Sequence, residues 1–232
     1  MTRLGVVTGL AAEARLIEKA FKRARCAPPA LACAGADAER ARTAGRRLIA
    51  EGADALISFG LCGGLDPALR PGTLMLPAEV LATDGARFAV DDGLRAAAAA
   101  ALGRSDLRLA EGTVLGLDRQ VTTAADKRAL FEQTAAQAVD MESFGVAGIA
   151  REAGVPVLVL RAVADPAERD LPRAAIDATG PEGRVRLFKV LSTMYLRPWE
   201  GPAMIRLAYE ARLAVDTLER TAAVLSELLG GD

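Results

Sequence analysis

Several acidic side chains stand where an apolar segment gives way to a turn or a helix. Asp140 and Glu142 flank a methionine in AVDMESFGVAG, with apolar sequence on both sides. Asp165 ends the apolar run VPVLVLRAVAD and precedes a proline, which favours an extended backbone at the aspartate. In apolar surroundings the pKa of Asp165 would rise by desolvation, and the group could then act as a general acid near neutral pH.

Each of these acids also has a structural interpretation. Asp165 is explained equally well as the cap of the next segment and as part of a site at a strand end. An acid in the first turn of a helix gains about 0.3–1 kcal/mol from the helix dipole, which would account for Glu142. One cap does not require both Glu142 and Asp140, however. On its pattern alone, Glu13 is a surface residue early in an amphipathic helix.

The chain contains no histidine, and this restricts its chemistry. It excludes Ser-His-Asp and Cys-His catalysis as well as zinc bound by histidine. Proton transfer would therefore fall to Asp, Glu, Lys, Tyr or water. Cys26, Cys33 and Cys62 are odd in number and fit no metal-binding spacing. We expect no metal, no cofactor, reduced thiols and a cytoplasmic location.

The overall composition narrows the class further. The 232 residues include 29 basic and 30 acidic side chains, so no basic excess indicates a nucleic-acid partner. No apolar run approaches the roughly 20 residues of a membrane span. Glu13 and Glu18 interrupt the apolar start that a secretory signal needs. The length and the lack of linkers or repeats predict a single domain over residues 1–232.

Strand and helix patterns alternate along the chain. Strands are predicted at 3–10, 30–36, 54–60, 72–82, 86–91, 138–141 and 155–165, with one or two more at 107–118. Helices are predicted at 11–24, 38–52, 92–103, 123–135, 142–154 and 203–229. This alternation predicts an α/β layer fold around a mainly parallel sheet. Since ligands of such sheets bind beyond the carboxyl ends of the strands, the candidate site segments are Gly9–Glu13, Gly60–Gly64, Asp140–Glu142 and Asp165.

The segment FGLCGGLDP is rich in glycine but matches neither the dinucleotide loop nor the Walker loop. We interpret LCGGLDP as a glycine turn after the strand at 54–60. The turn has two open interpretations, a simple strand-to-helix connection and a close approach of the backbone to a small ligand.

Three motifs in chain order resemble the nucleoside phosphorylase/nucleosidase superfamily of the purine nucleoside phosphorylase and uridine phosphorylase type. GVVTGLAAEA resembles the start of methylthioadenosine/S-adenosylhomocysteine nucleosidases, and FGLCGGLDPALRPGTLMLP resembles the family's glycine loop and following strand. AVDMESFGVAGIAREAGVPVLVLRAVAD resembles the D/E-M-E helix and the strand that ends in a catalytic aspartate. The resemblance implies a three-layer α/β fold, with a central twisted mixed sheet flanked by helices, and cleavage of an N-glycosidic bond to a purine.

RAVADPAERDLP and LSTMYLRPWEGP carry a finer resemblance, to the hopanoid-associated phosphorylase branch. Members of that branch are the proposed adenosylhopane nucleosidases of bacteria. This resemblance implies release of adenine from a 5′-modified adenosine such as adenosylhopane, in hopanoid biosynthesis. Because members of the superfamily are usually oligomers, the resemblance also implies a homodimer that binds a small-molecule nucleoside.

The superfamily resemblance assigns roles to the acids. Asp165 matches the acid that protonates the purine's imidazole nitrogen, Glu142 the glutamate that holds the ribose hydroxyls, and Glu13 the glutamate that activates water. Asp140 is interpreted as a junction residue that orients the helix start. The substrate-binding residues implied by the match are Met141 under the ribose, and Gly9, Leu61, Cys62, Gly63, Gln120 and Val121.

Some positions depart from the family pattern. Ala164 stands where the family has a serine before the catalytic aspartate, and Gln120 where nucleosidases often have phenylalanine. Leu61 and Ser58 stand where phosphorolytic members place phosphate ligands, which favours water as the nucleophile.

Three hypotheses therefore stay open: a hydrolase, a phosphorylase with phosphate as co-substrate that yields a sugar 1-phosphate, and a catalytically silent nucleoside-binding protein. A phosphorylase could still take its cation from one of four arginines, Arg42, Arg46, Arg47 and Arg161. The segment from Phe188 to Ile205 is expected to wall a pocket for the 5′ group, or to form a core or dimer contact, with Met194, Tyr195, Trp199 and Met204.

Overall fold

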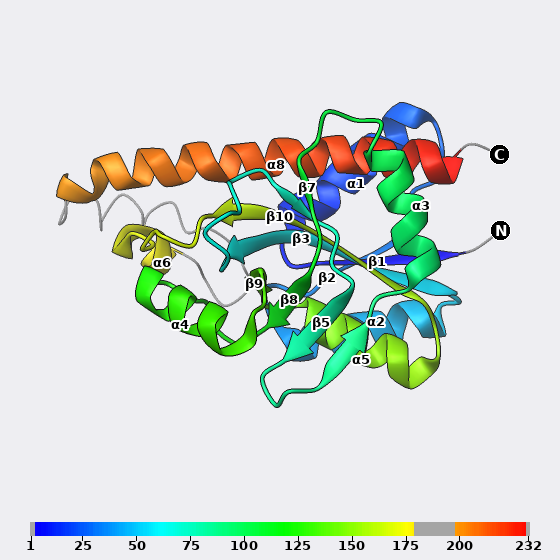
Figure 1. Cartoon of the computed structure of the whole chain (residues 1–232). Helices are drawn as coiled ribbons and strands as arrows, with labels where there is room; N and C mark the ends of the chain where they lie inside the picture. The colour runs from blue at the N-terminus through cyan, green and yellow to red at the C-terminus, as the bar shows by residue number, and fades with distance from the viewer. Residues whose placement is uncertain (1–2, 179–197, 231–232) are drawn as a thin grey trace.

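The computed structural model describes residues 3–178 and 198–230 (Figure 1). The strands are β1 (Leu4–Thr8), β2 (Ala30–Cys33), β3 (Ala55–Gly64), β4 (Leu74–Met75), β5 (Glu79–Ala82), β6 (Arg87–Ala89), β7 (Leu109–Ala110), β8 (Thr113–Gly116), β9 (Ala138–Asp140) and β10 (Val157–Asp165). The helices are α1 (Ala11–Ala24), α2 (Ala38–Ala50), α3 (Asp92–Leu102), α4 (Ala124–Thr134), α5 (Ser143–Ala153), α6 (Arg173–Ala178), the 3₁₀ turn η1 (Pro198–Glu200) and α8 (Gly201–Gly230).

The strands form one mixed sheet in the order β6-β5-β8-β9-β3-β10-β4-β7, with β1 beside the first half of β3 and β2 beyond β1. The antiparallel pairs are β3–β9, β4–β10 and β5–β6. Helices α1, α3 and α8 cover one face, and α2 and α5 cover the other (Figure 1). The expected three-layer α/β fold with a mixed central sheet is therefore confirmed.

Strand β3 is longer than the sequence predicts. Its residues Leu56 to Gly63 pair with β10, and on the other side β1 pairs with its first five residues. Strand β9 then takes over from β1 and pairs with Gly63 and Gly64. The turn prediction for LCGGLDP is wrong for its first four residues, because hydrogen bonds from these neighbours keep the glycine segment extended.

The strand predicted at 72–82 is two strands. Pro77 has no N–H to donate to a ladder, so β4 ends before it and β5 begins after it. The N–H groups of Leu76 and Ala78, on either side of the proline, bond to the carbonyls of Ala110 and Gly112, each at 2.8 Å. These two bonds hold the segment that connects β4 to β5.

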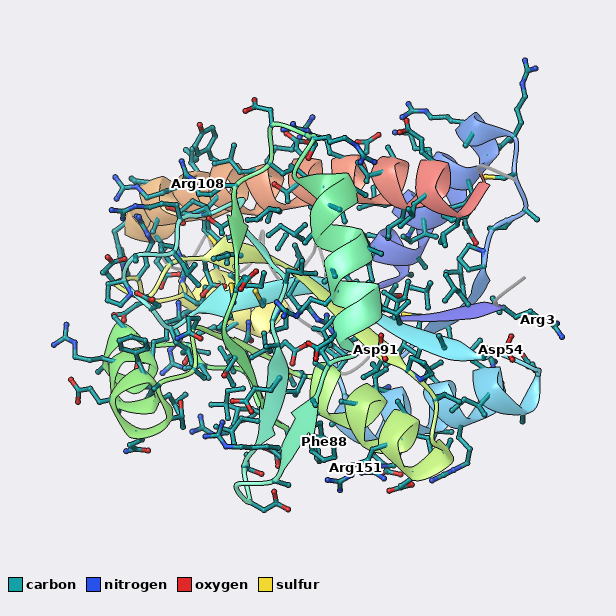
Figure 2. The ribbon with its side chains drawn as sticks, turned by 45° about the vertical axis from the view of Figure 1, so that its right-hand side comes forward. Arg3, Asp54, Phe88, Asp91, Arg108 and Arg151 are labelled. Atoms are coloured by element: carbon teal, nitrogen blue, oxygen red, sulfur yellow. The ribbon has the colours of Figure 1, made fainter. Side chains whose placement is uncertain are left out.

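A second set of contacts lies near the amino ends of the strands, at the opposite edge of the sheet from the acidic strand ends. Figure 2 shows Arg3, whose N–H donates to the Asp54 carboxylate at 3.0 Å, and Asp91, which caps the start of α3. The Arg151 guanidinium lies 4.3 Å from the centre of the Phe88 ring. None of the helices within residues 3–178 and 198–230 is both long and apolar enough to cross a bilayer.

Helix α8 packs on the core through buried residues such as Leu218, while its end is exposed, and this contrast gives a stability prediction. Leu218 is fully buried in the core cluster that α8 shares with the sheet, whereas Leu228 near the end of α8 is 45% exposed. We expect Leu218→Ala to lower the free energy of unfolding by about 2–5 kcal/mol, because it removes buried methyl groups and leaves a cavity. Leu228→Ala should change it by no more than about 0.5 kcal/mol. Urea unfolding of both variants checks this, and equal losses would contradict it.

Candidate active site

A cavity of about 430 Å³ opens at the carboxyl ends of β1, β3, β9 and β10. Strands β1, β3 and β10 are parallel neighbours, so their carboxyl ends share one edge of the sheet. All of the residues predicted from sequence to be catalytic or substrate-binding line this cavity: Gly9, Glu13, Leu61, Cys62, Gly63, Gln120, Val121, Met141, Glu142 and Asp165. Further lining residues that the sequence did not single out include Arg119, Leu171 and Ile176.

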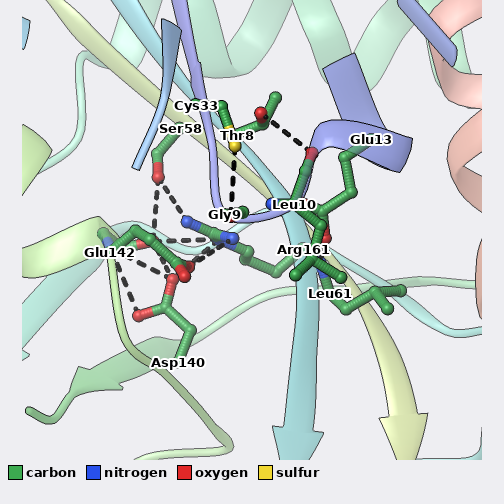
Figure 3. Close-up of polar contacts among 11 residues, drawn as sticks. Thr8, Gly9, Leu10, Glu13, Cys33, Ser58, Leu61, Asp140, Glu142 and Arg161 are labelled. Atoms are coloured by element: carbon green, nitrogen blue, oxygen red, sulfur yellow. Dashed lines mark hydrogen bonds and ion pairs between the residues drawn. The ribbon is translucent and has the colours of Figure 1, made fainter. Parts of the chain in front are cut away.

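Behind the cavity lies Arg161, a fully buried arginine of β10 (Figure 3). Its Nε lies 2.7 Å from Asp140 Oδ2, and its Nη1 lies 3.0 Å from Glu142 Oε2. Its Nη2 donates to the Ser58 hydroxyl at 2.6 Å. A buried guanidinium requires paired acids and hydrogen-bond acceptors, and here these partners come from β3, β9 and the start of α5. Arg161 therefore fixes three chain segments relative to one another.

Asp140 joins this network to helix α5. Its Oδ2 accepts the Ser143 N–H at 3.1 Å, and the carboxylate also accepts the Ser143 hydroxyl. The same oxygen faces Arg161. This is the geometry expected of a junction residue, because one carboxylate both caps the helix start and holds the guanidinium.

Glu142 does not cap the helix, although it occupies the N-cap position of α5. Its carboxylate turns instead toward Arg161 and the backbone of Gly9, where a Cβ atom would overlap it. Burial raises the pKa of Glu142 to about 8, opposed by Arg161 and reinforced by Asp140 and Glu13. The helix dipole alone therefore does not explain where the Glu142 carboxylate points.

Glu13 is buried, with 4% of its surface exposed, so its interpretation as a surface residue is wrong. Its two carboxylate oxygens accept the N–H of Leu10 at 2.8 Å and the N–H of Leu61 at 3.0 Å. Burial raises the pKa of Glu13 above its usual range, although Arg161 and these N–H groups act to lower it. The helical pattern could not reveal this, because the partners lie on the loop before the helix and on β3.

Gly60 allows Glu13 and Arg161 to approach the same strand. A Cβ atom at residue 60 would lie 2.6 Å from Arg161 Nη1 and 2.8 Å from the oxygens of Glu13. Real Cβ contacts are longer than this, so any side chain here would displace one of the charged groups. One part of the glycine segment is therefore needed for close packing of charged groups against the backbone.

Asp165 stands at the end of β10, where the pairing with β3 shifts register between Val163 and Asp165. Such a bulge re-aims the side chain that follows it. The Asp165 carboxylate forms an ion pair with Lys127 of α4, a fully buried residue that the sequence analysis missed. Burial raises the pKa of Asp165, and Lys127 acts against that rise. Nothing in the spacing around Lys127 reveals this contact, because α4 and β10 meet only in the folded chain.

Other candidates from the sequence lie elsewhere. Arg42 and Arg47 form ion pairs with Glu152 and Glu51 outside the cavity, and Arg46 is exposed on α2. Ser58 is buried against Arg161 rather than open to a ligand.

The segment expected to wall a pocket for the 5′ group is described only in part. Phe188, Met194 and Tyr195 fall outside the described residues. Trp199 and Ile205 are 70% and 73% exposed, and neither they nor Met204 is among the described residues that line the cavity. These three residues therefore do not wall the cavity that the described residues form, and the alternative of a core or dimer contact stays a prediction.

The raised pKa of Glu142 gives a prediction on stability. A carboxyl whose pKa is about 8 when folded and 4.5 when exposed binds its proton more tightly in the folded state. Its contribution is therefore present at low pH and is lost as pH rises toward 8, by up to about 1.4 kcal/mol per pH unit. We expect thermal unfolding between pH 5 and 9 to show this decline. Glu142→Gln should flatten it, and the exposed Glu132→Gln should not; equal slopes for wild type and Glu142→Gln would contradict the assignment.

The structure is similar to that of 5′-methylthioadenosine/S-adenosylhomocysteine nucleosidase of Neisseria meningitidis in complex with methylthio-immucillin-A, at 19% identity, full coverage of both chains and a TM-score of 0.73. The corresponding Helicobacter pylori nucleosidase has 16% identity over 99% of this chain and 97% of that one, with a TM-score of 0.69.

Futalosine hydrolase of Helicobacter pylori gives 17% identity over 99% of this chain and 96% of that one, with a TM-score of 0.69. At such identities these likenesses show the shared fold. The sequence itself matches the family model described as "Phosphorylase superfamily" over residues 21–195, which is most of the chain. This protein therefore belongs to the phosphorylase superfamily and is an enzyme of the nucleosidase or nucleoside phosphorylase class.

Proposed function

We propose that this enzyme hydrolyses the N-glycosidic bond of a purine nucleoside, with water as the nucleophile. The observation that carries the proposal is the placement of three acids around one cavity of nucleoside size: Glu13 and Glu142, which are buried, and Asp165, which is half-buried. Two of them, Glu13 and Glu142, lie close to the same guanidinium, Arg161. Asp165 lies apart with a cation of its own, Lys127. The site therefore offers one pair of acids for the sugar and water, and a separate acid for the base.

The chemistry of bond breaking suits this division. As the bond to the base breaks, the sugar gains positive charge, and this charge favours the ionised form of Glu142, which would hold the ribose hydroxyls. Glu13 would take a proton from water, since a buried carboxyl with a raised pKa is a suitable base near neutral pH. Asp165 would give a proton to the imidazole nitrogen of the leaving purine. Met141 lines the same cavity and would pack under the ribose.

The choice of water over phosphate rests on the charges at the cavity. Arg119 provides the one basic side chain among the described residues that line it, and Arg119 is exposed to solvent. Arg161 is already engaged by Asp140 and Glu142 and does not line the cavity. Leu61 offers no side-chain donor. A dianion would therefore face carboxyl groups without a free buried cation, which favours hydrolysis over the phosphorolytic alternative.

We further propose a 5′-modified adenosine as the substrate, with adenosylhopane as the example that the sequence resemblance suggests. The names of the similar structures support a substrate with a 5′ substituent, because they include 5′-methylthioadenosine/S-adenosylhomocysteine nucleosidases. Leu171 and Ile176 give one wall of the cavity an apolar character that an alkyl group could contact. Release of adenine in bacterial hopanoid biosynthesis, a homodimeric assembly and a cytoplasmic location belong to the same proposal.

A nucleoside panel tests the reaction. We expect the purified protein to release adenine from methylthioadenosine, adenosylhomocysteine or adenosylhopane in phosphate-free buffer, measured by chromatography of base and sugar. Addition of phosphate should not increase the rate. Release that requires phosphate and yields a sugar 1-phosphate would establish the phosphorylase instead. Binding without any release would establish the silent binding protein.

Substitution of the three acids tests the site. Glu142→Gln, Asp165→Asn and Glu13→Gln should each lower kcat by about 10²-fold or more, because each removes a proton-transfer or charge-stabilising group. The exposed Glu18 on the same helix as Glu13 provides a matched control, and Glu18→Gln should leave kcat unchanged. Turnover that survives both Glu142→Gln and Asp165→Asn without loss would show that the chemistry lies elsewhere.

A further inference from the structure

Helix α4 has a single buried residue, and it is a lysine. Lys127 is fully buried, whereas the other residues of this helix are exposed or only partly buried, and the helix lies beside the carboxyl end of β10 (Figure 1). Its Nζ contacts the Asp165 carboxylate and donates to the carbonyls of Pro166 at 2.9 Å and Arg169 at 3.1 Å. An ammonium group has three donors, and these three acceptors use all of them. The position of Nζ is therefore closely defined.

The placement of α4 is fixed independently of this contact. Thr123 caps the start of the helix through its hydroxyl, which accepts the Asp126 N–H at 3.1 Å. Asp170, from the loop after β10, accepts the Ala124 N–H at 2.7 Å. A buried lysine is costly unless it is paired, so the folded chain gains nothing from this residue without an acid opposite it.

Asp165 has few other means of orientation. Ala164, the preceding residue, carries only a methyl group where the sequence resemblance leads one to expect a serine hydroxyl. Among the residues that the structure describes, Lys127 is the one whose side chain donates to the Asp165 carboxylate, and it does so at Oδ2. The other oxygen, Oδ1, is left available for a ligand in the cavity that Asp165 lines.

We propose that Lys127 is the positioning residue for Asp165, in place of the missing serine. This inference rests on the proposed function. Lys127 holds Oδ2, so that the acid presents its proton on Oδ1 to the purine imidazole nitrogen. The proton passes from Oδ1 to the base as the electron pair of the glycosidic bond moves to the base. Water supplies hydroxide to the sugar and a proton to Glu13, and the carboxylate left at Asp165 faces the Lys127 ammonium. Exchange with solvent after product release restores both acids.

The groups that face Asp165 from the packed elements define its titration. Lys127 approaches from α4, the Cys62 thiol from β3, and Glu210 from α8, where Glu210 is paired with Arg169 at 2.9 Å. Burial raises the pKa of Cys62 well above its ordinary value, so the thiol stays neutral. Lys127 is thus the cation in contact with Asp165, and its loss raises the pKa of the acid further. Activity that needs protonated Asp165 is then lost at a higher pH.

The first test is Lys127→Met, which keeps a long unbranched side chain and removes the charge. We expect kcat to fall about 10²-fold through misplacement of the acid. The alkaline side of the pH profile of kcat/KM should move up by about one pH unit or more. Asp170→Ala serves as the matched control, because it loosens the same junction without touching Asp165, and it should leave the pH profile in place. An unmoved profile in Lys127→Met, or an equal shift in Asp170→Ala, would overturn the proposal.

The second test needs no turnover. The ratio of the dissociation constants of 7-deazaadenine and adenine reports the contact to the imidazole nitrogen, and we expect wild type to prefer adenine by about tenfold or more. Lys127→Met should lose most of this preference, whereas a purely structural lysine would weaken both bases equally and leave the ratio intact. Were Lys127→Met unfolded, Lys127→Arg retains the charge but displaces the donor. It should lower kcat without moving the pH profile, and an unchanged kcat would overturn the proposal.

The outcomes separate this inference from the proposed function. A wild type that cleaves nucleosides while Lys127→Met retains both the pH profile and the base preference overturns the inference alone. If the wild-type protein cleaves no nucleoside but prefers adenine over 7-deazaadenine, and Lys127→Met lacks this preference, the hydrolase proposal is overturned and the inference is supported. A wild type with neither activity nor preference for adenine overturns both.

Discussion

The buried guanidinium of Arg161 is the interaction on which the arrangement of the strand ends depends. It lies among Asp140, Glu142 and Glu13 and takes hydrogen-bond partners from β3 and α5. Burial raises the pKa values of both Glu13 and Glu142 against the opposing effect of Arg161, and for Glu142 the neighbouring carboxyl groups of Asp140 and Glu13 add to the rise. The same burial that costs stability supplies acids that can exchange protons near neutral pH.

The two ends of the cavity use the same principle with different cations. Arg161, held by fixed planar hydrogen bonds, serves two functional acids at once, while Lys127 serves Asp165 alone. An arginine remains charged under any condition of interest and suits a permanent structural pair. A lysine is a compact point charge, and beside a single carboxyl it changes the strength of that acid without sharing its charge elsewhere. In the proposed mechanism, the cavity separates charge stabilisation at the sugar from proton donation to the base.

The layers of the fold could be predicted from the sequence because they follow from local patterns. The buried strand predicted at 155–165 and the helices predicted at 123–135 and 142–154 each follow from patterns within a few neighbouring residues. The errors arose where long-range hydrogen bonds decide the structure. The segment Leu61–Gly64 is extended because β9 and β10 pair with it. Strand β4 separates from β5 at Pro77, and the N–H groups on either side of this proline bond to the carbonyls of Ala110, in β7, and Gly112, just after it.

The sequence by itself determined which residue types could do chemistry, and the absence of histidine left acids as the proton carriers. It also placed Asp140, Glu142 and Asp165 at strand ends, since apolar runs stop there. Only the tertiary structure decided that Glu13 is buried and that Lys127 reaches Asp165. Both depend on contacts between segments far apart in the chain, and a helical pattern reports which face is apolar without reporting which buried charge lies opposite.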